Sequence, residues 1–129
     1  MYAMIKVEDV DSFVRSWEES WNAKNLEKIL SHFSEDVVFR SPVAQRIVGG
    51  DGVLHGKDQL RSYWAEGLKR VPNLQFTVRE YYVGVNCLLL NYFNQSGVLV
   101  SEFFVFEKNL IVEGYGTYPV GSVNPAGVE

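Results

Sequence analysis

Val-Leu-Val-Ser-Glu-Phe-Phe-Val-Phe, at residues 98–106, alternates in a way that predicts a β-strand covered on both faces. Glu102 is the only ionisable side chain in this stretch, and it shares the more aromatic face with Phe104 and Phe106. A buried charge is costly unless it is paired, protonated or facing a wet cavity. We therefore expect a central strand at residues 98–106 and look for function at Glu102.

The composition is typical of a single soluble globular domain. The chain has 129 residues, 47% of them hydrophobic and 22% charged, and a net charge of −4 without a basic run, which argues against nucleic acid. The absence of a long apolar run argues against a membrane partner. One cysteine, Cys87, excludes an intrachain disulfide and predicts a cytoplasmic location. We predict one domain over residues 1–129, with a core at 11–118 and a flexible tail at 119–129.

Helical periodicity dominates the first half of the chain. Residues 1–10 are interpreted as a lead-in. A first helix follows a cap at Asp11 or Ser12, a second short helix follows a cap at Asn25, and a third covers 57–71. Three helices are therefore expected before the main run of strands.

Alternation with a period of two begins at Leu74 and predicts strands connected by short turns, which implies antiparallel neighbours. An earlier short strand at 37–41 carries Phe39 and Ser41 on one face and is stopped by Pro42, and 43–56 is interpreted as a loop. The fold class is thus α+β, with a curved antiparallel sheet, three helices on its concave face and a cavity between them. The four late strands are expected at 74–83, 87–94, 98–107 and 110–118.

Three stretches, 21–29, 32–42 and 56–64, resemble the nuclear-transport-factor-2-like superfamily. This superfamily has a cone-shaped, cystatin-like α+β fold, shared with ketosteroid isomerase and SnoaL-like polyketide cyclases. The resemblance covers about residues 13–118 and implies a pocket inside the cone. It specifies the fold but leaves the activity open, because one fold hosts many functions. The resemblance implies ligand-binding positions at Trp17, Ser41, Trp64 and Phe104, with Glu102 as a polar anchor or acid/base. Phe39 is added to them because it shares the strand face of Ser41.

The chain departs from ketosteroid isomerase at two of three functional positions. The aspartate base of those enzymes is matched by Ser41, which cannot abstract a proton unaided. Their tyrosine donor is matched by Trp17, and only the strand carboxylic acid is kept, as Glu102. The ketosteroid isomerase site is an established example of a carboxylic acid that an apolar environment keeps neutral. Extending this to Glu102 is an analogy. Ketosteroid isomerase activity is not expected.

The remaining candidates each have a structural interpretation beside the functional one. His55, in a Gly-rich loop, is a candidate helper base over the cavity mouth or an ordinary solvated histidine. Trp17 and Trp64 are cavity walls or core filling, and Glu102 is a ligand anchor or a hydrogen-bonded structural carboxylate. No cluster has the spacing of metal ligands, so no metal or cofactor is expected.

Three hypotheses follow from these patterns. In the first, the cone holds a small apolar or aromatic ligand anchored by Glu102. In the second, the protein is an isomerase or cyclase acting on a cyclic ketone or polyketide-like substrate, with Glu102 as acid or base. In the third, the protein is a structural dimer whose cone is filled by its own side chains. A homodimer through the convex sheet face is expected in addition, because strand aromatics suit such a contact.

Overall fold

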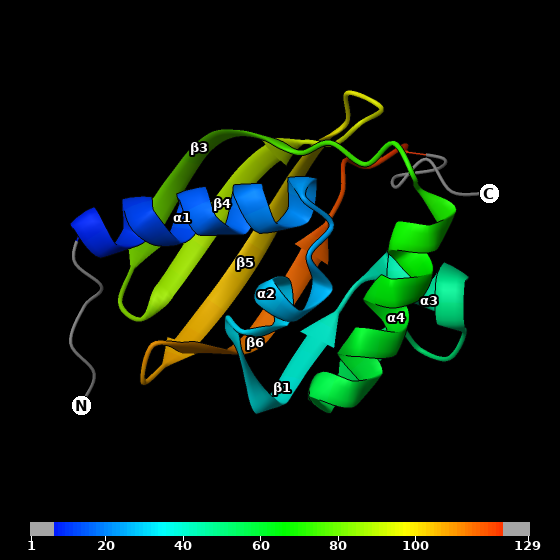
Figure 1. Ribbon diagram of the computed structural model, residues 1–129, viewed down its shortest axis with the longest axis horizontal. Helices are drawn as coiled ribbons and strands as arrows, with labels where there is room; N and C mark the ends of the chain where they lie inside the picture. The colour runs from blue at the N-terminus through cyan, green and yellow to red at the C-terminus, as the bar shows by residue number, and fades with distance from the viewer. Residues whose placement is uncertain (1–6, 123–129) are drawn as a thin grey trace.

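The computed structural model describes residues 7–122 and shows a mixed α+β chain, as the sequence predicts (Figure 1). Helices and strands alternate in the first half, and four strands follow in the second half. In chain order the elements are α1 (Val7–Asn22), α2 (Leu26–Leu30), β1 (Phe33–Arg40), α3 (Pro42–Val48), β2 (Val53–His55), α4 (Gly56–Arg70), β3 (Thr77–Gly84), β4 (Cys87–Phe93), β5 (Leu99–Glu107) and β6 (Leu110–Thr117).

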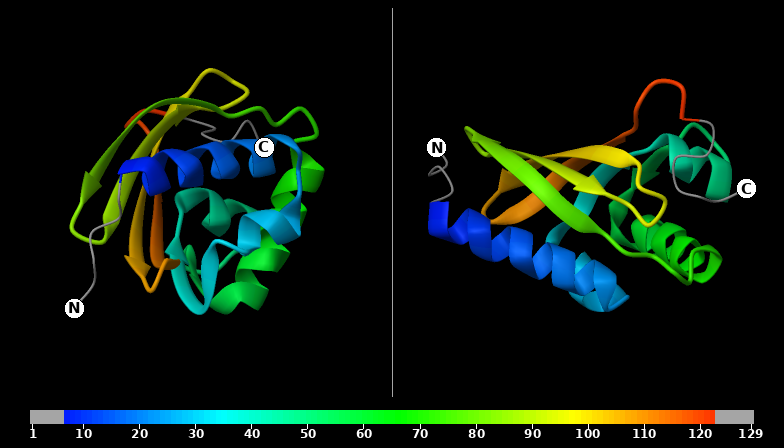
Figure 2. Two further views of the ribbon diagram at one scale, coloured as in Figure 1. Left: turned by 60° about the vertical axis from the view of Figure 1, so that its left-hand side comes forward. Right: turned by 90° about the horizontal axis from the view of Figure 1, so that it is seen from above.

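The described strands form one six-stranded sheet in the order β2-β1-β6-β5-β4-β3. The sheet curves over α1, α2 and α4, which all lie on its concave side (Figure 2). The strand β5 is interior, between β4 and β6, and the register places Glu102 opposite Leu90 of β4 and Gly116 of β6. The carboxyl of Glu102 therefore lies near the middle of the sheet.

The late hairpins agree with the sequence pattern, except that the strand expected at 74–83 begins only at Thr77. The pairs β3–β4, β4–β5 and β5–β6 are antiparallel, as their short turns predict. At the β5–β6 turn Lys108 and Asn109 have φ angles of 52° and 68°. Two successive positive φ angles are typical of the tight turns that match the twist of paired strands.

The first helix begins earlier than predicted. It starts at Val7 and not after a cap at Asp11 or Ser12, so residues 7–10 of the expected lead-in are helical; residues 1–6 lie outside the described part. Val10 is buried and extends the apolar stripe by one turn, which explains the longer helix. The predicted cap of the second helix is confirmed, because the Asn25 side chain accepts a hydrogen bond from the Lys28 backbone N–H.

The segment predicted as a loop at 43–56 instead contains α3 and β2. Pro42 was interpreted as a strand stop, but it also stands at the first position of α3, where its missing N–H costs nothing. The Ser41 hydroxyl caps this helix by accepting a hydrogen bond of 3.1 Å from the Val43 backbone N–H. The helices therefore number four among the described residues, not the three expected.

The first strand is also longer than the predicted 37–41. It runs from Phe33 to Arg40 and pairs in parallel with β6, with a register shift between Phe33 and Val38. The sheet is thus mixed and not wholly antiparallel, because the chain passes through helices and hairpins before β6 returns beside β1. Of the tail predicted at 119–129, residues 123–129 lie outside the described part.

The two faces of β5 differ in burial. Val100, Glu102, Phe104 and Phe106 are buried on the concave face, whereas the residues between them are half-buried. The expectation that both faces are covered is therefore correct for the concave face only. The half-buried residues of the convex face are Leu99, Ser101, Phe103 and Val105.

We predict that Asn22→Ala destabilises the fold by about 1–3 kcal/mol, because it leaves two backbone groups unpaired. The Asn22 amide donates to the Phe76 carbonyl at 2.9 Å and accepts from the Phe76 N–H at 2.7 Å, joining the end of α1 to the segment before β3. Urea unfolding measures the change, with the exposed Asn73→Ala as the matched control. Equal unfolding midpoints for the two variants would contradict this role.

Candidate functional site

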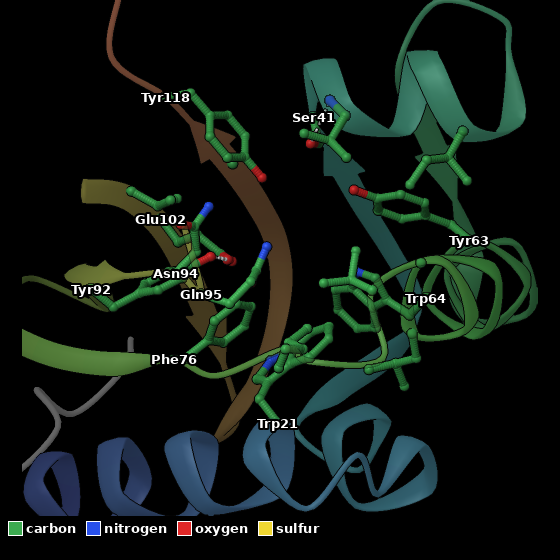
Figure 3. A pocket seen from close by; sticks show the side chains of 18 of the residues that line it. Trp21, Ser41, Tyr63, Trp64, Phe76, Tyr92, Asn94, Gln95, Glu102 and Tyr118 are labelled. Carbon is green, nitrogen blue, oxygen red and sulfur yellow. Dashed lines mark hydrogen bonds between the residues drawn. The ribbon is translucent and has the colours of Figure 1, made fainter. Parts of the chain in front are cut away.

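A pocket opens between the concave sheet face, α4 and the C-terminal end of α1 (Figure 3). It contains about 660 Å³ of empty space, part of which is open to solvent. Ligand sites are commonly concave, largely apolar and furnished with a few polar groups, and this pocket has that composition. Its lining residues are Trp21, Phe39, Ser41, Val43, Ile47, Tyr63, Trp64, Gly67, Leu68, Val71, Leu74, Phe76, Tyr92, Asn94, Gln95, Val100, Glu102, Gly116 and Tyr118.

Glu102 supplies the carboxyl of the pocket. It is only 7% exposed, and Tyr92 of the neighbouring strand donates a 2.6 Å hydrogen bond to its Oε1. Burial raises the pKa of Glu102 from its ordinary 4.5 to about 7, while the Tyr92 hydrogen bond acts in the opposite direction. The carboxyl thus exchanges its proton near neutral pH.

Two further hydroxyls come from the other side of the pocket. Tyr63 of α4 and Tyr118, which directly follows β6, both direct their hydroxyls into the space beside Ser41 (Figure 3). Burial raises the pKa of each phenol, and hydrogen bonding with Ser41 opposes that shift. Both groups therefore stay protonated at neutral pH and are available as hydrogen-bond donors.

Two glycines of β6 leave room on the concave face. A Cβ at Gly114 would lie 2.6 Å from Cδ1 of Phe39, so only glycine lets the Phe39 ring lie against the sheet. A Cβ at Gly116, opposite Glu102, would lie 3.3 Å from the Ser41 Oγ. The absence of a side chain at Gly116 therefore lets Ser41 and Tyr118 lie close to the sheet next to Glu102.

The structure brings four of the predicted site residues to the pocket wall: Phe39, Ser41, Trp64 and Glu102. Trp17 and Phe104 are not among the lining residues. Trp17 stacks on Phe76 at 5.6 Å between ring centroids, and Phe104 is fully buried. They support the wall from behind because the inner half of the cone is filled with aromatic rings. Whether the four lining residues bind a ligand stays a prediction.

His55 does not reach the cavity. It is exposed at the end of β2 and is not one of the lining residues. Strand alternation explains the difference, since Leu54 is buried on the inner side and His55 consequently faces outward. A role of His55 as a helper base over the pocket is therefore not supported.

Sequence reasoning missed the tyrosine partner of Glu102. Tyr92 pairs with Val100, two residues before Glu102 on the same face, and diagonal neighbours on a sheet are within reach of an aromatic side chain. The signal was the Gln95-Ser96-Gly97 turn: once this turn is taken as the centre of the hairpin, the register that follows places Tyr92 beside Glu102. Helical periodicity over residues 57–71 predicts that Tyr63 faces inward beside Trp64, as it does, but the approach of its hydroxyl and of Tyr118 to the pocket depends on how α4 and the segment after β6 pack.

Within residues 7–122, no group of three or more His, Cys, Asp or Glu side chains is arranged to hold a metal ion. In the same part of the chain, each helix is too short or too polar to cross a lipid bilayer.

Comparison with known proteins identifies the family. The sequence model of the SnoaL-like domain matches residues 14–93. A SnoaL-like protein of unknown function from Burkholderia thailandensis E264 is 32% identical, with a TM-score of 0.86 over 91% of this chain and 99% of that chain. No curated protein sequence matches the chain. The resemblance inferred from residues 21–64 is confirmed.

Two more distant structures show the fold alone. A protein of unknown function with a cystatin-like fold from Methylobium petroleophilum PM1 is 13% identical, with a TM-score of 0.73 over 95% of this chain and 83% of that chain. TerC, co-crystallised with polyporic acid, is 12% identical, with a TM-score of 0.71 over 84% of this chain and 90% of that chain. The predicted cystatin-like fold class is confirmed.

We predict that Glu102→Gln stabilises the protein more at high pH than at low pH. The folded-state pKa of Glu102 is raised from 4.5 to about 7, so the native carboxyl holds a proton that the unfolded chain has released. The wild type therefore loses stability as the pH rises between these two values, by up to about 3 kcal/mol, and changes no further above about pH 7.

Urea unfolding at about pH 5 and about pH 8 measures this difference between mutant and wild type. Glu107→Gln, on the exposed end of the same strand, is the matched control. Its free energy of unfolding relative to the wild type should not increase with pH. A mutant-minus-wild-type difference that stays constant across this range would show that the carboxyl is not held in its neutral form.

Proposed function

The chain belongs to the SnoaL-like domain family, and we propose that it binds a small apolar or aromatic molecule in the pocket, with Glu102 as polar anchor. One observation carries the proposal: a buried carboxyl lies on the wall of an otherwise mainly apolar pocket that is open to solvent. Burying a carboxyl lowers stability, so a buried carboxyl is more often kept where it serves a function. Carboxyls in clefts whose pKa is shifted are typical of functional sites.

The packing of the cone favours binding over a purely structural role. Aromatic rings fill its inner half, where Phe104 meets Phe13 and Phe33 edge to face at 6.3 and 6.1 Å. The outer half, next to Glu102 and Tyr63, remains a pocket. The co-crystal of TerC with polyporic acid gives general support, since TerC has this fold and was crystallised with a small organic molecule.

An isomerase or cyclase acting on a cyclic ketone or polyketide-like substrate is the second candidate. A carboxyl whose pKa is about 7 is suited to proton transfer at neutral pH, and Tyr63 and Tyr118 would supply donors to a carbonyl oxygen. Two facts weigh against this candidate. His55 lies outside the pocket, and Ser41, at the position of the ketosteroid isomerase base, caps α3. Binding is therefore the better-supported function.

We also propose that the protein is a homodimer through the convex sheet face. Half-buried and exposed apolar side chains of neighbouring strands meet there, and Phe103 lies 6.0 Å from Tyr115 between ring centroids. Arg40 stacks over Tyr115 at 4.8 Å and pairs with Glu113, which adds a polar rim. An apolar centre with a charged rim is typical of protein interfaces.

Other partners and the location follow from the charge and the cysteine content. The net charge of −4 makes nucleic acid a poor partner, and the single cysteine, Cys87, which is free, suits a reducing compartment. We therefore keep the cytoplasm as the proposed location and expect neither a nucleic acid nor a membrane surface as a partner.

For the binding function we predict that aromatic ligands quench the tryptophan fluorescence of the wild type, because Trp21 and Trp64 line the pocket. Glu102→Gln should weaken the binding of ligands found in this way by about tenfold or more, the loss expected for one buried polar contact. Glu107→Gln is the control and should bind as the wild type does. Identical affinities of Glu102→Gln and the wild type for every ligand would refute the anchor role.

For the dimer we predict that Phe103→Lys shifts the protein from dimer to monomer in sedimentation equilibrium, because a charge would be buried at the centre of the interface. Val85→Lys is the matched control: Val85 is 74% exposed in the β3–β4 turn, away from the proposed interface. A wild type that is monomeric at tens of micromolar, about the concentration of a typical experiment, would exclude the dimer.

A further inference from the structure

The charge balance of the pocket specifies the ligand further. Among the described residues that line the pocket, Glu102 is the only carboxylate, and none is a lysine, arginine or histidine. The side chains that surround the carboxyl are otherwise apolar, aromatic, amide or hydroxyl groups. When Glu102 ionises, the pocket therefore carries a negative charge that no cation of its own wall balances.

The rest of the wall favours the opposite charge. Seven aromatic residues line the pocket, and their rings surround the same space (Figure 3). The rings are closely spaced: Trp21 and Trp64 are 5.0 Å apart between centroids, Phe39 and Trp64 are 5.4 Å apart, and Phe76 and Tyr92 are 4.6 Å apart. Aromatic faces attract cations, most strongly where water is excluded.

We propose that the pocket selects an organic cation, an amine carried on an aromatic or apolar body, whose ammonium group pairs with the carboxyl of Glu102. This inference rests on the proposed binding function and adds the chemical class of the ligand. The aromatic rings hold the apolar body and stabilise the charge. The ligand supplies the counter-ion that the wall lacks, so the costly buried charge becomes a paired one.

The pH dependence separates this ligand class from the alternatives. The titratable groups facing Glu102 are Tyr92 from β4, Tyr63 from α4 and Tyr118 after β6. Burial raises the pKa of all three phenols, so Glu102 is the group of this cluster that titrates near neutrality. An ammonium binds the ionised carboxyl, so its affinity rises about tenfold per pH unit below about pH 7 and then levels off. A neutral carbonyl ligand binds the protonated carboxyl and shows the reverse dependence.

Isothermal titration calorimetry with matched probes tests the proposal. The probes are phenethylamine and benzyltrimethylammonium as cations, acetophenone as the neutral acceptor and phenylacetate as the anion. Each is titrated into the wild type, Glu102→Gln and the control Glu107→Gln at about pH 5.5, about pH 7 and about pH 8.5. At about pH 5.5 the phenethylamine titration is repeated in two buffers of different ionisation enthalpy. The difference between the two observed binding enthalpies gives the number of protons released.

We expect both cations to bind more tightly than acetophenone and phenylacetate at pH 8.5, and to lose at least tenfold in affinity in Glu102→Gln but not in Glu107→Gln. Phenethylamine should release close to one proton at pH 5.5. Binding of acetophenone that tightens as the pH falls, without cation binding, overturns the inference and leaves the proposed function intact. Cation binding that Glu102→Gln does not weaken also overturns the inference. A failure of all four probes overturns the inference and counts against the binding function as well.

Discussion

The hydrogen bond from Tyr92 to Glu102 is the interaction on which the site depends. It satisfies a carboxyl that strand alternation places on the concave face of an interior strand, where an isolated charge would be too costly. The bond requires that β4 and β5 pair in one register, because a slip by one residue would turn Tyr92 to the opposite face. The β5–β6 pairing in turn places Gly116 opposite Glu102, so both neighbouring strands determine the surroundings of the carboxyl.

The two halves of the cone have different roles: the inner half is packed core and the outer half contains the pocket. In the inner half, Trp17, Phe33 and Phe104 are almost completely buried and provide the packed core that stabilises a chain of this size. In the outer half, Tyr63 of α4 and Tyr118, which follows β6, direct their hydroxyls into the pocket. The packed half supplies the rigidity that keeps the polar groups of the open half in position.

The sequence predicted what depends on local pattern and missed what depends on packing. Alternation and turn residues were enough for the antiparallel strands β3 to β6, and for the burial of Glu102 on β5. Pro42 was misleading because a proline can both end a strand and begin a helix. The feature that identifies the helix is Ser41, whose hydroxyl caps the N-terminus of α3. His55 was misassigned because β2 was not recognised, so the face of its side chain could not be deduced. Trp17 and Phe104 have the right positions for a pocket, but neighbouring rings cover them.

The glycines of β6 have a consequence for the shape of the concave face. Gly116 lines the pocket and Gly114 lets the Phe39 ring lie against the sheet, and both belong to a strand that is hydrogen-bonded on its two sides. At these two positions the inner surface of the sheet is bare backbone, so its contour follows from strand pairing and not from a loop. A side chain introduced at Gly116 would begin 3.3 Å from the Ser41 Oγ, so a single substitution there would reshape the pocket wall while the paired strands that frame it stay the same.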